Sequence, residues 1–307
     1  MERTVRQTIK EITRKHLLNG SKCYGQCLTA VGWVGGTLPE LYEQDGMIEL
    51  SMADVAGAGI VVGAALAGER PIYVVRYQGF QCYNSPIITN YAMKSKEIWK
   101  RPCPLLIRSI AMEGGIGPVA GSSHHSIYQR MPGAKIISPM TPDEYELAYD
   151  SFMKDDDVYY ISEHRKSYDN TKEFKNTIHE KAEITLFPIS ITRFAAEEAK
   201  NQLEKEGIKV NVIHQLWIKP FTFHKKWKEA LKNSTMGGIV LDDDYEEGVA
   251  SSIAHKMMLE TDKPVRTMCL EHRTAGFHPK VDNLPPNKYD IIKKIKQICK
   301  YKEICYV

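Results

Sequence analysis

The chain has 307 residues, of which 26% are charged and 43% hydrophobic, and its formal net charge is +3. This length is long for one domain and comfortable for two, each of which can bury a core of its own. The composition is typical of a soluble globular protein. The chain contains no basic tract interleaved with aromatic residues, so we expect no nucleic-acid partner.

Membrane insertion and secretion are not expected either. The longest apolar run, Val55 to Gly68, is too short and too rich in glycine to cross a bilayer. The N-terminus lacks the apolar core of a signal peptide. The seven cysteines do not form a disulfide framework, and Cys23 and Cys27 lack a second pair that would complete a zinc site. We therefore expect a cytoplasmic protein with reduced thiols and without metal-ligating side chains.

The first half of the chain alternates helices with apolar strands. Thr4 is the expected cap of an amphipathic helix that Gly20 stops. The glycine-rich residues 31–37 indicate a loop. Residues 141–144, Thr-Pro-Asp-Glu, match a capping box with proline at the first helical position. The helices are predicted over residues 4–19, 54–68 and 142–154, and the strands over residues 22–28, 71–76, 104–108, 134–138 and 158–162.

Small residues predominate between Met52 and Gly68. We interpret this stretch as a helix so slim that another backbone or a flat ligand can lie against it. Asp54 is the only residue in it whose side chain can do acid–base chemistry. This acid has two interpretations: it complements the dipole at the start of the helix, or it is a buried carboxyl that hydrogen-bonds a ligand nitrogen.

Two loops follow predicted strands, which is where ligands bind in open α/β sheets. The first, residues 77–84, is rich in aromatic and amide side chains. The second, residues 109–126, is long and glycine-rich, and such a loop inside a compact domain is either functional or disordered. His124 and His125, followed by Ser126, favour function, and surface histidines on a flexible loop are the alternative.

The second half repeats the alternation on a smaller scale. We place the boundary in the polar segment 169–181, which gives domains at 1–172 and 173–307. Alternating strands and helices imply a doubly wound α/β fold with a parallel sheet. We find no separate catalytic constellation in this half. The strands are predicted over residues 184–189, 209–213, 238–241 and 265–270, and the helices over residues 193–207, 248–259 and 289–300.

Asp54 is followed at residues 59–71 by Gly-Ile-Val-Val-Gly-Ala-Ala-Leu-Ala-Gly-Glu-Arg-Pro. This pattern resembles thiamine-diphosphate enzymes, in which an acid precedes a glycine-alanine helix and an apolar strand. The chain is most similar to the beta subunit of 2-oxoacid dehydrogenases of the pyruvate dehydrogenase type, and more distantly to the C-terminal half of transketolase. Residues 215–221 extend the likeness into the second half. The resemblance implies a doubly wound pyrimidine-binding domain followed by a smaller α/β domain of the transketolase C-terminal type.

The resemblance also implies site residues. Asp54 stands where relatives carry the glutamate that hydrogen-bonds the pyrimidine nitrogen of thiamine diphosphate, and its shorter side chain withdraws the carboxyl by about 1.5 Å. A closer helix, a bridging water or impaired cofactor activation are the three possible consequences. Phe80 matches the aromatic that stacks on the pyrimidine, and Tyr83 in the same loop is a further expected contact. Gln26 is the nearest match to an acid that holds the cofactor, and His125 matches a catalytic histidine.

A partner chain follows from what this sequence lacks. The family binds Mg²⁺ and the diphosphate with a Gly-Asp-Gly segment and a later asparagine, and no Gly-Asp-Gly occurs here. The resemblance therefore implies an alpha subunit that supplies this half of the site. It also implies a heterotetramer in which this chain self-associates through its C-terminal domain. Some relatives bind potassium through backbone carbonyls near the helix at residues 142–154, so a potassium ion is a further candidate.

Three functions stay open at this point. The favoured one is a 2-oxoacid dehydrogenase subunit, which decarboxylates its substrate and transfers the acyl group. The second is one half of a split transketolase, which moves a two-carbon ketol unit between sugar phosphates. The third is a non-catalytic, regulatory beta-like subunit, because Gln26 and Asp54 both depart from the family pattern.

Overall fold

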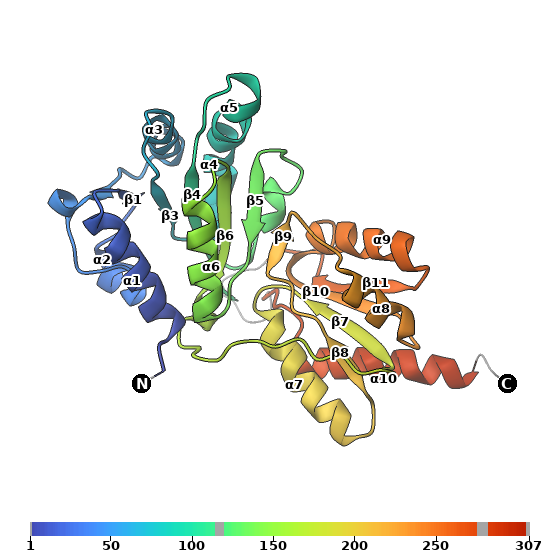
Figure 1. The fold of residues 1–307 in the computed structure, drawn as a ribbon. Coiled ribbons are helices and arrows are strands. Elements are labelled where there is room, and N and C mark those ends of the chain that lie inside the picture. Colours follow the sequence, from blue (N-terminus) through green and yellow to red (C-terminus); the bar gives the residue numbers. More distant parts are fainter. Residues whose placement is uncertain (1, 114–119, 275–281, 305–307) are drawn as a thin grey trace.

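A computed structural model of the chain describes residues 2–113, 120–274 and 282–304 (Figure 1). The N-terminal and C-terminal halves form two α/β units that lie side by side, each with its own sheet. Every strand pair is parallel except one at the edge of the first sheet. The predicted α/β class is therefore confirmed. In the described part of the chain, no helix combines the length and the hydropathy that crossing a membrane needs.

The first sheet has seven strands in the order β2-β1-β3-β4-β6-β5-β9. Its central strands β3, β4 and β6 are buried along their whole length, which explains why β3 and the first residues of β4 and β6 are apolar and do not alternate with polar residues. The strands are β1 (Cys23–Gly25), β2 (Met47–Glu49), β3 (Ile72–Val75), β4 (Leu105–Ala111), β5 (Ala134–Ile137), β6 (Val158–His164) and β9 (Trp217–Lys219).

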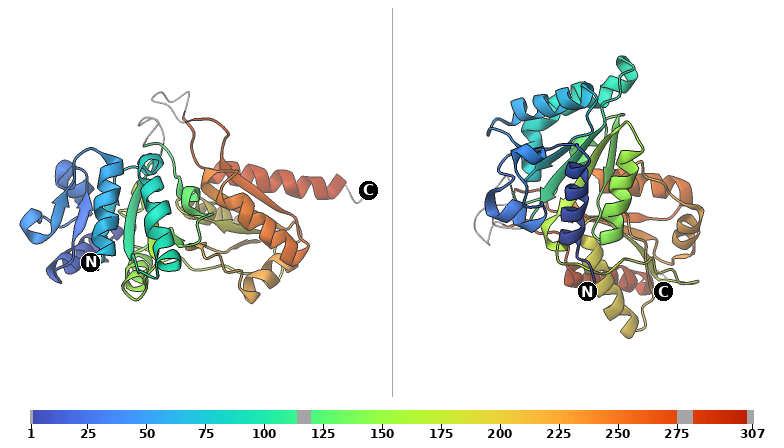
Figure 2. Two further views of the ribbon diagram at one scale, coloured as in Figure 1. Left: turned by 90° about the horizontal axis from the view of Figure 1, so that it is seen from above. Right: turned by 60° about the vertical axis from the view of Figure 1, so that its left-hand side comes forward.

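Helices cover both faces of this sheet (Figure 2). Successive residues of β3 show the two layers: Ile72 packs in the core under α1 and α6, and Tyr73 packs in the core under α3. The fold is therefore doubly wound. The helices are α1 (Val5–Leu18), α2 (Ala30–Gly36), α3 (Asp54–Leu66), α4 (Gln81–Ile87), α5 (Met93–Ile98) and α6 (Pro142–Met153), with a π-helical stretch, Ile88–Ala92, between α4 and α5.

The second sheet has four parallel strands in the order β11-β10-β7-β8. Helices α7 and α10 pack on one face of this sheet, and α8 and α9 pack on the other. The boundary at residue 172 stays a prediction, since β9 follows it in the chain but pairs with β5 of the first sheet. The elements are β7 (Ile184–Pro188), α7 (Thr192–Lys205), β8 (Val210–Val212), α8 (Lys225–Asn233), β10 (Gly238–Tyr245), α9 (Val249–Thr261), β11 (Val265–Leu270) and α10 (Lys288–Ile304).

Two local expectations are wrong. The loop expected at residues 31–37 is largely the short helix α2, in which residues 31–35 all have left-handed φ angles between 51° and 63°. Left-handed backbone is unfavourable for side chains with a Cβ, and glycine at two of the five positions lowers that cost. The capping box is also not formed: the Thr141 hydroxyl is buried without a partner. Glu144 instead forms two hydrogen bonds with Arg193 of the second unit, a contact that no local pattern records.

A buried ion pair joins β4 to β6. Arg108 donates from Nε and Nη2 to the two oxygens of Glu163 at 3.0 and 2.8 Å, and the exposed side-chain fractions are 3% and 0%. Tyr168 donates a further hydrogen bond to Glu163. Burial opposes the charge of the guanidinium, but Glu163 more than offsets it, and the pKa of Arg108 is raised. The pair therefore keeps both charges inside the sheet.

We expect Arg108→Met to lower the free energy of unfolding by about 3–5 kcal/mol, because it leaves the Glu163 carboxylate buried without a cation. Urea unfolding of the full chain measures this loss. Lys225→Met is the matched control, since its partner Glu229 is exposed and such pairs contribute about 0–1 kcal/mol. Equal losses of free energy of unfolding for the two variants would show that the buried pair stabilises the fold no more than the exposed pair does.

Candidate cofactor site

A pocket of about 130 Å³ opens at the C-terminal ends of β1 and β3. This is the edge where ligands bind in open parallel sheets. The pocket has room for a group larger than a single water molecule. Its lining residues are Gln26, Cys27, Met52, Asp54, Tyr73, Val74, Val75, Arg76, Tyr77 and Phe80.

Asp54 is the first residue of α3, and its half-buried carboxylate lines the pocket. The N-cap position belongs to Ala53, which offers no side-chain cap, so Asp54 does not act as the cap. Asn84 donates from Nδ2 to Asp54 Oδ1 at 3.4 Å and to the Phe80 carbonyl at 3.2 Å. The Tyr73 hydroxyl in turn donates to Asn84 at 3.0 Å. A buried amide thus orients the carboxylate towards the pocket.

One pKa shift follows from this arrangement. Burial and, after it, the Asp54 carboxylate raise the pKa of Tyr73. The Tyr73 hydroxyl therefore keeps its proton at neutral pH and stays the donor to Asn84. The sequence analysis did not identify Asn84, which lies on α4 in the segment after β3, because nothing in that segment distinguishes it from the neighbouring amide residues.

Gln26 follows β1 and presents an unsatisfied donor. Its Nε2 is buried and has no hydrogen-bond partner among the described residues. Leaving a buried donor unpaired costs about 1–3 kcal/mol, so such a group indicates a missing partner. Because Gln26 lines the pocket, an acceptor on a bound ligand is the partner that this position allows.

The aromatic predictions have different outcomes. Phe80 is half-buried and lines the pocket, with its ring centroid 6.0 Å from that of Tyr77. Tyr83 lies on α4 with 56% of its surface exposed and is not part of the lining, so its cofactor contact stays a prediction. Arg76 was missed: it is the first charged residue after the apolar strand β3, and it also lines the pocket.

His125 lies elsewhere. Its ring is fully buried, with Nδ1 3.1 Å from Ser162 Oγ and Nε2 3.1 Å from Asp242 Oδ2. The structure therefore does not bring His125 to the pocket of Asp54, and its catalytic role stays a prediction. Residues 114–119 of the long loop lie outside the described part of the chain.

Asp242 begins a run of three aspartates that the sequence analysis did not identify as a candidate site. Three carboxylates near the end of an apolar strand are nevertheless a recognisable signal.

Two family descriptions match the chain, "Transketolase, pyrimidine binding domain" over residues 29–171 and "Transketolase, C-terminal domain" over residues 175–283. This chain therefore consists of a transketolase-type pyrimidine-binding domain followed by a transketolase-type C-terminal domain. Asp54 and Phe80 both lie within the segment matched to the pyrimidine-binding domain. The predicted family and the predicted order of its two domain types are therefore confirmed.

Relatives in sequence and in structure agree with this assignment. The chain is 24% identical to the pyruvate dehydrogenase E1 component subunit beta of Rickettsia felis, with 98% of this chain and 99% of that protein covered. It is 27% identical to the 2-oxoisovalerate dehydrogenase subunit beta of Bacillus subtilis, with 78% and 80% covered. A solved structure described as "Split gene transketolase, inactive beta4 tetramer" has a TM-score of 0.70 at 13% identity, with 97% and 98% covered. The beta-subunit likeness predicted from the sequence is thus confirmed.

We expect Gln26→Leu to leave the free energy of unfolding unchanged or to raise it by about 1 kcal/mol, because it removes an unpaired buried donor. Gln78→Leu is the matched control. The Gln78 amide donates to the Ser109 carbonyl and to Ser162, and it accepts from the His124 amide, so its loss is expected to cost about 1–3 kcal/mol. Urea unfolding compares the two variants. If Gln26→Leu lowered the free energy of unfolding as much as Gln78→Leu does, the Gln26 amide could not be an unpaired donor.

Proposed function

We propose that this chain is the pyrimidine-binding, beta-type subunit of a two-chain thiamine-diphosphate enzyme that acts on a 2-oxoacid. The observation that carries the proposal is the joint position of Asp54, Phe80 and the unpartnered Gln26 in one pocket of a pyrimidine-binding domain. The names of the sequence relatives, which are beta subunits of 2-oxoacid dehydrogenases, support the substrate class.

The lining residues fit the pyrimidine half of this cofactor. When bound, thiamine diphosphate supplies an electron sink for carbanions formed from carbonyl substrates. In the proposal, the Asp54 carboxyl would share a hydrogen bond with a ring nitrogen, and Asn84 would hold this carboxyl in place. Phe80 offers a flat apolar face, and Gln26 donates to an acceptor on the ring. The apolar remainder of the pocket excludes water from these contacts.

The short side chain of Asp54 is compatible with this role because α3 packs closely on the sheet. Gly57 faces the sheet, and a Cβ added there would lie 3.3 Å from Leu50 and 3.5 Å from the Tyr73 hydroxyl. A Cβ at this position would need only a small shift of the Leu50 tip, so α3 already lies in van der Waals contact with β3 here. Of the three consequences of the shorter acid, this close packing supports the helix that sits nearer to the ligand.

The outer face of α3 supports the partner subunit. Met52, Val55 and Ile60 are 81%, 53% and 53% exposed beside the pocket. A Cβ added at Gly59 or Gly63 would meet nothing within 4 Å, so the packing of this chain by itself does not require glycine there. A contiguous apolar face of small residues indicates a covering protein surface. We assign it to an alpha subunit that binds Mg²⁺ and the diphosphate with a Gly-Asp-Gly segment.

The assembly of the subunits, a further ion and the cellular location stay predictions within this proposal. They are the heterotetramer with self-association through the C-terminal domain, a potassium ion near α6 and a cytoplasmic location. The split transketolase stays the second candidate function, since it shares the fold, and the regulatory subunit stays the third.

Turnover of the reconstituted two-chain complex tests the role of Asp54. We expect Asp54→Ala to lower kcat at least about 100-fold, which is the usual contribution of a positioned acid or base. Asp169→Ala is the control, because Asp169 is exposed and, among the described residues, forms its ion pair with the half-buried Arg6. Full activity of Asp54→Ala would remove the catalytic assignment, and Asp54→Glu reports whether the missing methylene limits the rate.

Calorimetric titration of thiamine diphosphate with Mg²⁺ tests the division of the site between two chains. We expect binding to the complex with a Gly-Asp-Gly-bearing subunit and none to this chain alone. Turnover of 2-oxoacids or of ketose phosphates then separates the first two functions. A stable complex that binds no cofactor would establish the regulatory subunit instead.

A further inference from the structure

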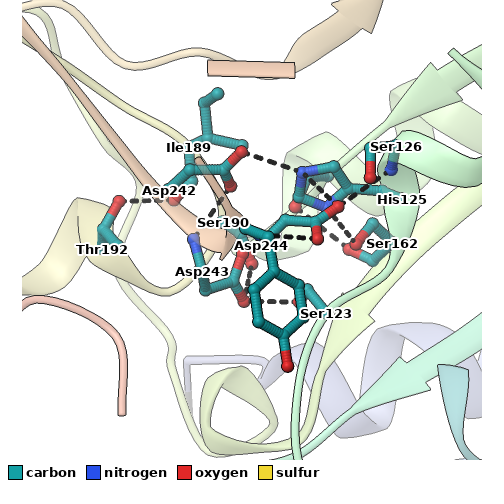
Figure 3. Close-up of polar contacts among 12 residues, drawn as sticks. Ser123, His125, Ser126, Ser162, Ile189, Ser190, Thr192, Asp242, Asp243 and Asp244 are labelled. Atoms are coloured by element: carbon teal, nitrogen blue, oxygen red, sulfur yellow. Dashed lines mark hydrogen bonds and ion pairs between the residues drawn. The ribbon is translucent and has the colours of Figure 1, made fainter. Parts of the chain in front are cut away.

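Three consecutive aspartates end strand β10 at the boundary between the two units (Figure 3). Asp242, Asp243 and Asp244 are 0%, 3% and 1% exposed, so all three carboxyl groups lie away from water. His125 of the first unit enters among them, with Nε2 3.1 Å from Asp242 Oδ2 and 3.8 Å from Asp244 Oδ2. Among the ion pairs of the described residues, His125 is the only basic group that contacts this cluster.

The protein holds these side chains in fixed directions. The Asp243 amide donates to Asp242 Oδ1 at 2.9 Å, and the Ser126 amide donates to Asp244 Oδ2 at 2.9 Å. Ser162 Oγ lies 3.1 Å from His125 Nδ1, on the side of the ring away from Asp242. The contact at Nδ1 fixes the orientation of the ring and keeps Nε2 facing the aspartates, as outer-shell groups do around metal sites.

Asp243 carries the unsatisfied atom of the cluster. Its Oδ2 accepts from Ser123 Oγ at 2.6 Å and from Ser190 Oγ at 2.8 Å, but its Oδ1 is buried without any partner. A buried carboxylate oxygen without a partner is costly, and a bound cation would supply the missing partner.

We propose that His125, Asp242 and Asp243 bind one divalent transition-metal ion of the Zn²⁺ or Mn²⁺ class at the boundary between the two units. One ligand atom from each residue lies within 4.8 Å of the other two, so small side-chain shifts bring them to metal-bonding distance of about 2.0–2.2 Å. One imidazole with carboxylates suits these ions, whereas Mg²⁺ and Ca²⁺ prefer oxygen ligands alone.

The ion has a structural role. It would fix the segment that begins at Ser123, at the end of the long loop, onto β10 of the second unit. A metal on Nε2, with Nδ1 facing Ser162, leaves His125 no free ring nitrogen, so this role replaces the catalytic one predicted from the sequence. The site is also distinct from the Mg²⁺ that the partner subunit is proposed to bind with the cofactor, and it does not depend on the proposed function.

Titration of the full chain with Mn²⁺ and with Zn²⁺, after removal of metals and without thiamine diphosphate, tests the site. We expect one Mn²⁺ per chain and a rise in Tm on binding. Asp243→Asn keeps the shape of the side chain and removes its charge, and we expect it to weaken Mn²⁺ at least about 10-fold, the lower limit reported for disturbed metal sites. Mn²⁺ is the deciding probe, because Zn²⁺ also binds free thiols.

His179→Gln is the matched control, since His179 pairs with Glu204 outside the cluster and its loss is expected to leave affinity unchanged. A wild-type chain that shows no saturable Mn²⁺ or Zn²⁺ binding overturns the proposal. Equal affinity of the wild type and Asp243→Asn also overturns it. Where Asp243→Asn does not fold, His125→Gln replaces it with the same expectation. None of these outcomes depends on whether the cofactor binds.

Discussion

Parallel pairing of β1, β3, β4 and β6 fixes where the site can lie. Strands that run in the same direction end at one edge, so the segments after β1 and β3 emerge side by side there. β2 is parallel to β1, and α3 begins soon after it, so the first turn of α3 reaches the same edge. Gln26, Asp54 and Phe80 therefore meet through topology, although up to 54 positions separate them in the chain.

The two faces of the slim helix α3 differ: one packs on the sheet and the other is exposed. Its inner face, with Gly57 and Ala58, lets the helix lie close to β3 and carry Asp54 to the pocket. Its outer face leaves Gly59, Ile60 and Gly63 uncovered beside that pocket. An exposed apolar face of this kind supports the proposed second chain, which would cover it.

The two units are joined by buried polar contacts. Arg193 of α7 reaches Glu144 of α6 with 1% of its side chain exposed, and β9 adds a strand to the first sheet. His125 and the aspartates that end β10 form the third contact. Buried charges of this kind depend strongly on exact geometry, because a charge that loses its partner inside a protein is costly. The end of the long loop is therefore positioned by the second unit as well as by the first.

The sequence by itself determined the fold class, because apolar strands alternate with helices along both halves of the chain. Gln26, Asp54 and Phe80 came from the resemblance to thiamine-diphosphate enzymes, and their cofactor contacts stay predictions. Only the tertiary structure decided which groups are paired. Arg193 donates a hydrogen bond to Glu144, which the sequence placed in a capping box. Asn84 donates to Asp54, and His125 contacts Asp242, which lies 117 positions further along the chain. Local patterns record periodicity and turn preference over a few residues, whereas hydrogen bonds and ion pairs between distant segments depend on how those segments pack.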